Sequence, residues 1–272
     1  MYNWLRDALD GPATVITANR RLARVLQQEF AVQQQDAGLA AWESPRIQAL
    51  PDWLDTALRD AAGQENLPTR INHYHSTLLW DRCLRKELDS NGAGIGNLVR
   101  LSRETWQRLA DWNLTIKDVA RSAQSTDQRI FATAAGRYLG ILERSNWVDD
   151  AGMTSLVTDL IGQGRLVVQG RYTFAGFARD NPSLVRIREC LAGAGCEVRD
   201  VADKHPAAAP QLLAFESSDA EMRAAGAWAR ERIEKEPGQR VAIVANGLEH
   251  DAERIAGLAR EGLIPGYRMT AA

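Results

Sequence analysis

Hydrophobic positions near the start of the chain fall into short continuous runs that alternate with stretches of helical period. The run at 14–17 (TVIT) is rich in β-branched residues and predicts a buried strand. After a polar turn, apolar side chains recur every three to four positions from Leu22 to Phe30, as on one face of an amphipathic helix. A second strand at 46–50 and a helix that opens with Pro51 follow. This β-α-β-α order predicts a parallel sheet.

Between residues 75 and 161 the hydrophobic positions keep a helical period only. A glycine cluster at 92–96 and a polar run at 122–127 interrupt the pattern. We therefore predict an all-helical insertion of about four helices in this region. The apolar positions that carry the period are Leu78, Leu79, Cys83, Leu98, Leu101, Leu109, Trp112, Ile130, Phe131, Ala134, Tyr138, Leu142, Leu156, Val157 and Leu160.

Strand and helix patterns alternate again from Arg165 onward. Strands are predicted at 166–168, 172–174, 197–201, 212–215 and 241–245. Helices are predicted at 181–191, 218–235 and 250–261. A segment rich in Ala and Pro at 204–210 is typical of a linker and divides this region into two.

These patterns predict an α/β protein with three parts. Residues 1–74 and 162–205 form the first α/β domain, residues 75–161 form the helical insertion, and residues 211–272 begin a second α/β domain. Because the chain ends at Ala272, soon after a new β-α unit has started, we expect this second domain to be truncated.

Charge and cysteine content narrow the classes of function. The formal net charge is −2, so any contact with nucleic acid requires a local basic patch. Cys83, Cys190 and Cys196 have no CxxC spacing, which predicts neither a disulfide framework nor a zinc site. The sequence shows no signal peptide and no apolar stretch of membrane-spanning length. We therefore expect a cytoplasmic protein with no membrane partner.

No lysine of the chain has the neighbours that a nucleotide-binding or nuclease motif requires. A P-loop needs GxxxxGK[ST], and a PD-(D/E)XK nuclease needs an acidic residue two positions before a lysine. No lysine follows a glycine, and none has Asp or Glu two positions earlier. The sequence therefore predicts no cofactor, no metal and no catalytic residue in this chain. Its four lysines are Lys86, Lys117, Lys204 and Lys235.

Two other features have a structural alternative that is favoured over the functional one. His73 and His75 have no third metal ligand at a suitable spacing, which favours a loop or a helix start over a metal site. The eight tryptophans fall mostly on apolar helical faces, where core packing is favoured over base stacking.

One basic cluster lies at the turn between the first strand and its helix, where Asn19 precedes Arg20, Arg21 and Arg24. The exposed amides of a helix N-terminus, together with Asn and Arg side chains, suit the binding of phosphate. The alternative is a solvated helix face that carries basic residues and binds nothing. From the residues alone, the solvated face is the favoured interpretation of this cluster.

Three segments resemble elements of superfamily-one helicases, in the order in which the motor has them. VITANRRLARVLQQEF with IQALPDWLDTAL is similar to the strand and helix after the P-loop, where a turn faces single-stranded DNA. YTFAGFARDNPSLVRIRECL is similar to the DEXX-box strand and helix, and AFESSDAEMRAAGAWARERIEKEPGQRVAIVANG to the entry into the second motor domain. Together they resemble the AddB/RexB family of non-catalytic helicase–exonuclease subunits, in particular the AddB-like DNA repair proteins of proteobacteria.

The resemblance implies a RecA-like parallel-sheet domain that lacks the P-loop, with the helical insertion of the first motor domain at 75–161. It implies that the turn from Thr17 to Arg21 faces DNA. Where an active motor has the Asp-Glu pair of the DEXX box, this chain has Ala175 and Gly176. Both halves of the nucleotide site are then lost, as expected of an inactivated motor. The nuclease of the family is expected beyond residue 272.

We therefore expect a non-catalytic module that binds or guides single-stranded or tailed duplex DNA during double-strand break processing and docks an AddA-like helicase subunit. The alternative is a protein-interaction scaffold without direct DNA contact. An enzyme on a Rossmann-like sheet is disfavoured, because GxGxxG does not follow the first strand. The candidate DNA-binding residues are Thr17, Asn19, Arg20, Arg21 and Arg24.

Overall fold

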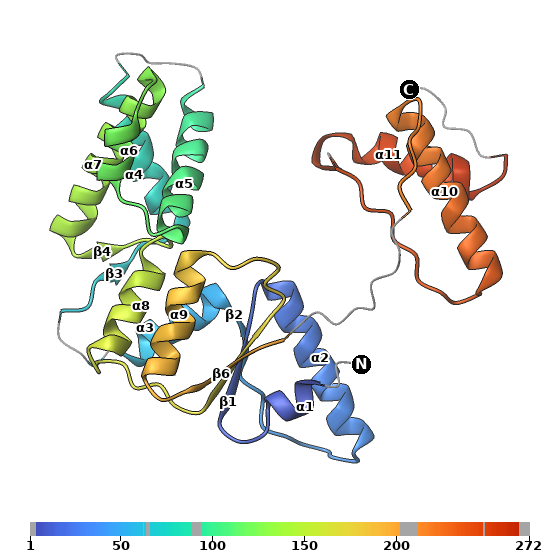
Figure 1. The fold of residues 1–272 in the computed structure, drawn as a ribbon, viewed down its shortest axis with the longest axis horizontal. Helices are drawn as coiled ribbons and strands as arrows, with labels where there is room; N and C mark the ends of the chain where they lie inside the picture. The colour runs from blue at the N-terminus through green and yellow to red at the C-terminus, as the bar shows by residue number, and fades with distance from the viewer. Residues whose placement is uncertain are drawn as a thin grey trace. The chain divides into compact units, whose positions relative to one another are not determined.

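The computed structural model describes residues 4–61, 63, 66–88, 94–201, 211–246 and 248–266. The chain divides into unit 1, residues 1–204, and unit 2, residues 205–272. Unit 1 contains the sheets and most of the helices, and unit 2 contains two long helices (Figure 1). The predicted linker at 204–210 and part of the glycine cluster at 92–96 lie outside the described residues.

Unit 1 is built on a sheet of four parallel strands, β1 (Ala13–Thr17), β2 (Ile47–Ala49), β5 (Arg171–Ala175) and β6 (Glu197–Asp200). Their spatial order is β2-β1-β5-β6. β1 lies inside the sheet and is buried on both faces, because Val15 packs into the core on one face and Ile16 into the core on the other. Thr17 is in register with Ala49 and with Ala175. The carboxyl ends of three strands therefore meet at one edge.

Helices cover both faces of this sheet (Figure 1). One face carries α1 (Trp4–Ala8) and α2 (Arg20–Asp36). The other face carries α3 (Leu50–Asp60), α8 (Met153–Gly162) and α9 (Pro182–Gly193). The larger core lies on this second face, where Phe174 is buried and the rings of Trp53 and Tyr172 meet edge to face with their centroids 5.9 Å apart. The chain is thus an α/β protein with a parallel sheet, as predicted.

The helices that follow β1 and β5 begin where the sequence offers a cap. Asn19 accepts a hydrogen bond from the backbone N–H of Leu22 at 2.9 Å, and Asn181 accepts one from that of Leu184 at 2.7 Å. Each Asn thereby satisfies a first-turn amide that has no partner within its helix. Pro182 adds a preset φ at the start of α9. Local sequence therefore fixes where both helices start.

A second, two-stranded parallel sheet consists of β3 (Thr69–Arg70) and β4 (Trp147–Val148). Between these strands the chain forms α4 (His73–Arg85), α5 (Ile95–Asp111), α6 (Ile116–Ser122) and α7 (Thr126–Ser145). Trp80 and Tyr138 are fully buried in the core of this helical part, with their rings stacked at 4.6 Å between centroids. Capping boxes at Thr115 and Ser125 start α6 and α7.

The helical insertion that we predicted at 75–161 includes α8, which packs elsewhere. α8 contacts α3 and α9, and its Val157 and Leu160 lie in the core on the second face of the four-stranded sheet. The helices that pack together apart from this sheet are those between β3 and β4. A helical period shows that a helix has a buried face, but it does not show which neighbour covers that face.

Three predicted strands do not form among the described residues. The segments 166–168, 212–215 and 241–245 adopt no β-structure. Val167, Leu212 and Val244 in these segments are 83%, 98% and 90% exposed. A β-rich apolar run becomes a strand only where a neighbouring backbone supplies hydrogen bonds, and these runs have no such neighbour in the described chain. The predicted second α/β domain is therefore represented here by its helices alone.

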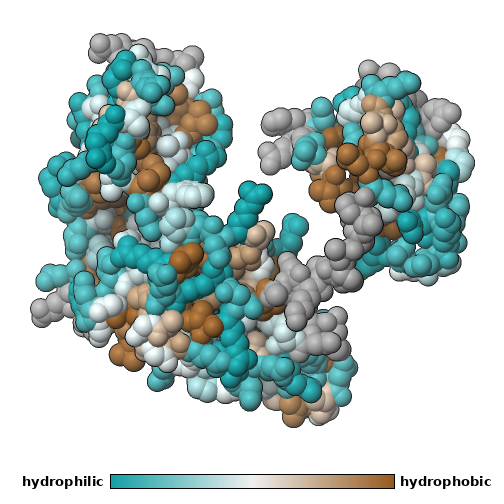
Figure 2. Space-filling model, viewed as in Figure 1, coloured by the Kyte–Doolittle hydropathy of each residue, from teal (hydrophilic) through white to brown (hydrophobic). Residues whose placement is uncertain are grey.

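Unit 2 consists of α10 (Ser218–Lys235) and α11 (Leu248–Leu263), which pack against each other. Glycines permit their close approach. A Cβ on Gly226 would collide with the carbonyl oxygen of Ala259, and one on Gly262 would collide with that of Arg223. Hydrophobic residues remain visible at the surface of this unit (Figure 2), in agreement with the exposure of Leu212.

Two glycines with the same backbone conformation give a matched test of the packing in unit 1. Gly170 has φ +84° and Gly195 has φ +86°, but only at Gly170 would a Cβ collide with a backbone oxygen, that of Pro12. We expect Gly195→Ala to cost about 1–2 kcal/mol in the free energy of unfolding, the cost of a left-handed alanine. Gly170→Ala should cost roughly 1–3 kcal/mol more, because the clash adds to that cost. Chemical denaturation measures both, and equal losses would contradict the clash.

Candidate nucleic-acid interface

The residues singled out from the sequence meet at one edge of the four-stranded sheet. β1 leads through α2 to β2 on one side, and β5 leads through α9 to β6 on the other. The chain therefore leaves two neighbouring strands in opposite directions, and open α/β sheets place their ligands at such a point. The turn after β1 and the turn after β5 are joined directly, since Ala18 N donates a hydrogen bond to Ala175 O at 3.1 Å. We call this place the carboxyl edge.

Thr17 and Asn19 build the turn at the carboxyl edge. Thr17 is fully buried, and its Oγ1 donates a hydrogen bond to the carbonyl oxygen of Asn19 at 2.9 Å. The side chain of Asn19 caps α2 through Leu22 N. Both polar groups are thus used within the protein, and they position the start of α2.

Arg20 is the first residue of α2 and pairs with an acidic residue of α3. Its Nε and Nη2 donate to the carboxylate of Asp52, with the shortest distance 2.6 Å from Nη2 to Oδ1. This hydrogen-bonded ion pair raises the pKa of the Arg20 guanidinium. The pair joins the first turns of two helices that start at the same edge. The charge of Arg20 is therefore compensated within the protein.

Arg21 and Arg24 are the uncompensated cations of the cluster. Both are exposed on α2, and neither makes an ion pair within the part of the chain that the structure describes. They lie three positions apart and so are neighbours on the helix surface. Arg179, in the loop after β5, is likewise exposed without such a pair among these residues. Sequence reasoning missed Arg179, although it lies four positions after Ala175 in the DEXX-like segment.

The turn after β5 leaves no free space beside the start of α2. Gly176 has φ +78°, and a Cβ at this position would collide with Cδ2 of Leu22. Ala175 is buried in the core that contains Leu22 at its margin. A leucine side chain from α2 therefore fills the region beside Ala175 and Gly176 at the carboxyl edge.

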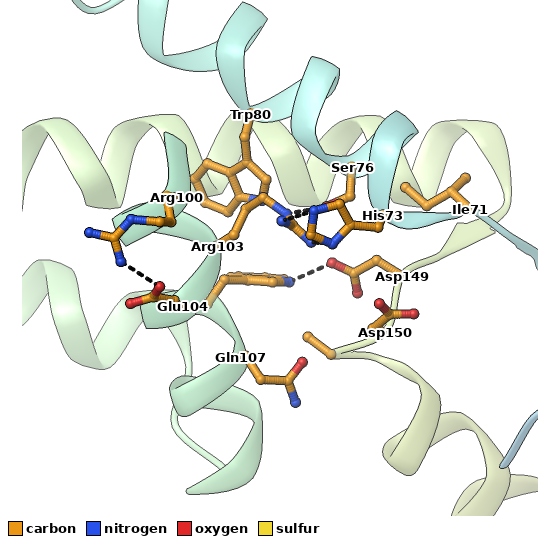
Figure 3. A pocket seen from close by; sticks show the side chains of 12 residues that line it. Ile71, His73, Ser76, Trp80, Arg100, Arg103, Glu104, Gln107, Asp149 and Asp150 are labelled. Carbon is orange, nitrogen blue, oxygen red and sulfur yellow. Dashed lines mark hydrogen bonds and ion pairs between the residues drawn. The ribbon is translucent and has the colours of Figure 1, made fainter. Parts of the chain in front are cut away.

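A separate cavity of about 320 Å³ lies in the helical part of unit 1 (Figure 3). Its walls come from α4, α5 and the turn after β4. His73 and Arg103 lie against each other across it, with 2.8 Å between His73 Nδ1 and Arg103 Nη2. Asn72 caps α4 by accepting from the backbone N–H of His75. The two histidines thus lie at a helix start, the interpretation favoured from the sequence.

The floor of this cavity is a connected set of buried hydrogen bonds around Asp149, which is 3% exposed. Asp149 Oδ2 accepts from Trp106 Nε1 and from the Tyr138 hydroxyl at 2.8 Å each. Its Oδ1 accepts from Gly152 N at 3.0 Å. The Tyr138 hydroxyl is also 2.9 Å from Ser76 Oγ. Burial raises the pKa of the Asp149 carboxyl despite these three donors.

The same burial shifts the pKa of the Tyr138 hydroxyl. Its pKa is raised, first because the hydroxyl is removed from water and next because the charge of Asp149 is close. Both polar groups have their hydrogen bonds satisfied inside the protein. The set joins α4, α5, α7 and the turn after β4, so its evident role is to hold these elements together.

Among the described residues, no group of three or more His, Cys, Asp and Glu side chains is arranged to hold a metal ion. No helix in the described ranges is both long and apolar enough to cross a bilayer. Of the tryptophans, Trp53 and Trp80 are buried as expected, but Trp112 and Trp228 are 59% and 47% exposed.

Comparison with known proteins gives no family for the chain. No protein-family model matches the chain, and no curated protein sequence matches it either.

The raised pKa of Asp149 predicts a specific dependence of stability on pH. The unfolded state loses its proton at the ordinary carboxyl value of about 4, whereas the folded state keeps it to higher pH. Stability is therefore highest below the unfolded value and falls as the pH rises through the folded value. Asp149→Asn, which cannot ionise, should lack this loss. Denaturation at a series of pH values upward from about 4 measures the free energy of unfolding of both proteins. As the pH rises, that of the wild type should fall relative to that of the variant. A constant difference would contradict the prediction.

Proposed function

We propose that this chain is a helicase-like module without catalytic activity, which binds or guides DNA in double-strand break repair. The proposal includes a RecA-like type for its sheet domain and a motor partner resembling the AddA helicase subunit. It combines the family resemblance of three sequence segments with the geometry of the carboxyl edge. The parallel sheet supports the proposal at the level of fold class.

The observation that carries the proposal is the separation of paired and unpaired cations at the carboxyl edge. Arg20 is held by Asp52, whereas Arg21 and Arg24 project from the first turns of α2 without an ion pair in the described chain. A guanidinium forms strong forked hydrogen bonds with phosphate oxygens, and the amides at a helix N-terminus add to the attraction. Such contacts hold a nucleic-acid backbone irrespective of its sequence.

A passive role, rather than nucleotide hydrolysis, is supported by the residues beside these arginines. Ala175 and Gly176 offer only a methyl group and a hydrogen where the resembled motors have two carboxylates. Leu22 lies against Gly176 in this region. In this proposal, α2 retains the surface that faces DNA, and the region that would bind nucleotide in a motor has become part of the core.

A second candidate function is a protein-interaction scaffold without DNA contact. The exposed apolar residues Leu212, Leu213 and Val244 of unit 2 favour it, because they belong to β-rich runs that have no strand partner in the described chain. Co-purification of a helicase subunit by a chain that has no affinity for DNA would support this candidate over the first.

DNA binding should depend on the unpaired arginines of α2. We expect Arg21→Glu/Arg24→Glu to weaken binding of single-stranded and tailed duplex DNA roughly tenfold or more at low salt, because two phosphate contacts become repulsive. The slope of log affinity against log salt should fall by roughly 1.4 to 1.8, the contribution of two contacts. Fluorescence anisotropy across a salt series measures both quantities.

The matched control is Arg108→Glu/Lys117→Glu, which makes the same change of charge at exposed positions of the helical part. This control should bind as wild type does. An α2 variant that binds like the control would refute the site, and a wild-type protein that fails to bind at low salt would refute the DNA role.

A further inference from the structure

The helical part of unit 1 contains a groove of about 520 Å³ between α4 and α7. Four basic residues line it: Arg82 from α4, Lys86 directly after the last residue of α4, and Arg137 and Arg144 from α7. All four are exposed. The groove shares no residue with the carboxyl edge.

Helical spacing explains why these side chains share one groove. Arg82 lies in the last turn of α4, and Lys86, four positions later, caps the helix with helical backbone angles. Arg137 and Arg144 are seven positions apart on α7, so each pair projects from one side. Tyr138 projects to another face of α7 and is fully buried in the core. The groove therefore lies on the solvent side of a helix pair that is fixed from within.

Two glycines line the groove without filling it with side chains. Gly136 and Gly140 of α7 both line it, and a Cβ on Gly136 would meet no heavy atom within 4 Å. A Cβ on Gly140 would lie 3.1 Å from Nη1 of Arg144. The guanidinium of Arg144 thus lies over the bare backbone at Gly140, inside the groove. Glycine in a helix interior is less favourable than alanine, and here it leaves room at the basic surface.

The groove carries more positive charge than its acidic neighbours compensate. Arg137 pairs with Glu87, 2.8 Å from Nη2 to Oε1. Arg82, Lys86 and Arg144 make no ion pair within the described residues. Arg85, Arg100 and Arg121 of the helical part have carboxylate partners, whereas Arg108 and Arg129 have none among the described residues. Like charges gathered at one place repel each other, and a bound anion relieves that repulsion.

We propose that the groove between α4 and α7 binds the phosphate backbone of DNA, in addition to the contact proposed at the carboxyl edge. This inference rests on the proposed function and adds a binding surface to it. An open groove that is lined by arginine and lysine has room for a chain of phosphates. Arginine binds phosphate through two parallel hydrogen bonds, and lysine attracts it as a point charge. The contact is independent of base sequence, because the groove offers cations rather than groups placed to bind base edges.

The first test compares salt dependence in charge-reversal variants. Lys86→Glu/Arg144→Glu should weaken binding of tailed duplex DNA roughly tenfold or more at low salt and lower the salt slope by roughly 1.4 to 1.8. The control is again Arg108→Glu/Lys117→Glu, whose positions do not line the groove. Far-ultraviolet circular dichroism and a thermal melt verify that each variant folds. The milder Lys86→Gln/Arg144→Gln should lower the salt slope by about the same amount, because it also removes two phosphate contacts, and it serves as the variant if the double Glu form does not fold.

The second test uses the wild-type chain and its small number of lysines. Acetylation of Lys86, measured by mass spectrometry, should be slowed several-fold by saturating DNA. Acetylation of Lys117, which is exposed on α6 outside the groove, should be unchanged. DNA binding by the wild type without protection of Lys86, and with the groove variant equal to its control, would overturn the groove while leaving the proposed function intact. Absence of any wild-type binding would overturn both.

Discussion

The pairing of β1 with β5 is the interaction on which the rest of unit 1 depends. Five residue pairs in parallel register, from Ala13 with Arg171 to Thr17 with Ala175, join segments that the whole helical part separates in sequence. Parallel pairing requires a long crossover, and here the crossover contains α2 to α8 together with β2 and the small sheet of β3 and β4. Because the register is fixed, the turn after β1 meets the turn after β5, and the carboxyl edge follows from that meeting. Gly176 lies at this meeting with φ +78°, and a Cβ there would collide with Cδ2 of Leu22.

Some arginines of unit 1 are paired with carboxylates and others are not, and this difference decides where the surface is positively charged. Arg20 joins α2 to α3 through Asp52, and Arg188 contacts both Asp180 and Asp200 near the ends of β5 and β6. Such pairs contribute little stability each when exposed, but they remove charge from the surface. Arg21 and Arg24 remain uncompensated at the carboxyl edge within the described chain. A chain with a net charge of −2 can therefore still present local positive surfaces to a polyanion.

Sequence patterns predicted the strands and helices of unit 1 where burial is strong and local, as in the TVIT run and the capped start of α9. They failed at 212–215 and 241–245, since strand formation depends on a partner backbone that lies elsewhere. The basic residues at 19–24 lie at the turn between a strand and its helix, where the sequence placed them, but the sequence could not show that Asp52 would neutralise Arg20. The groove escaped prediction entirely, because Arg82 and Arg144 are distant in sequence and are brought together only by the packing of α4 on α7.

The buried hydrogen bonds around Asp149 link the stability of the helical part to the shape of that groove. Ser76 of α4 and Tyr138 of α7 meet at 2.9 Å, and Asp149 holds Tyr138 from the turn after β4. The same two helices form the groove on their solvent side. A satisfied network in a low-dielectric core resists displacement, because separating its members leaves buried polar groups without partners. The spacing of the basic side chains is thus set before any ligand arrives, and a preformed surface spends less of its binding energy on ordering itself.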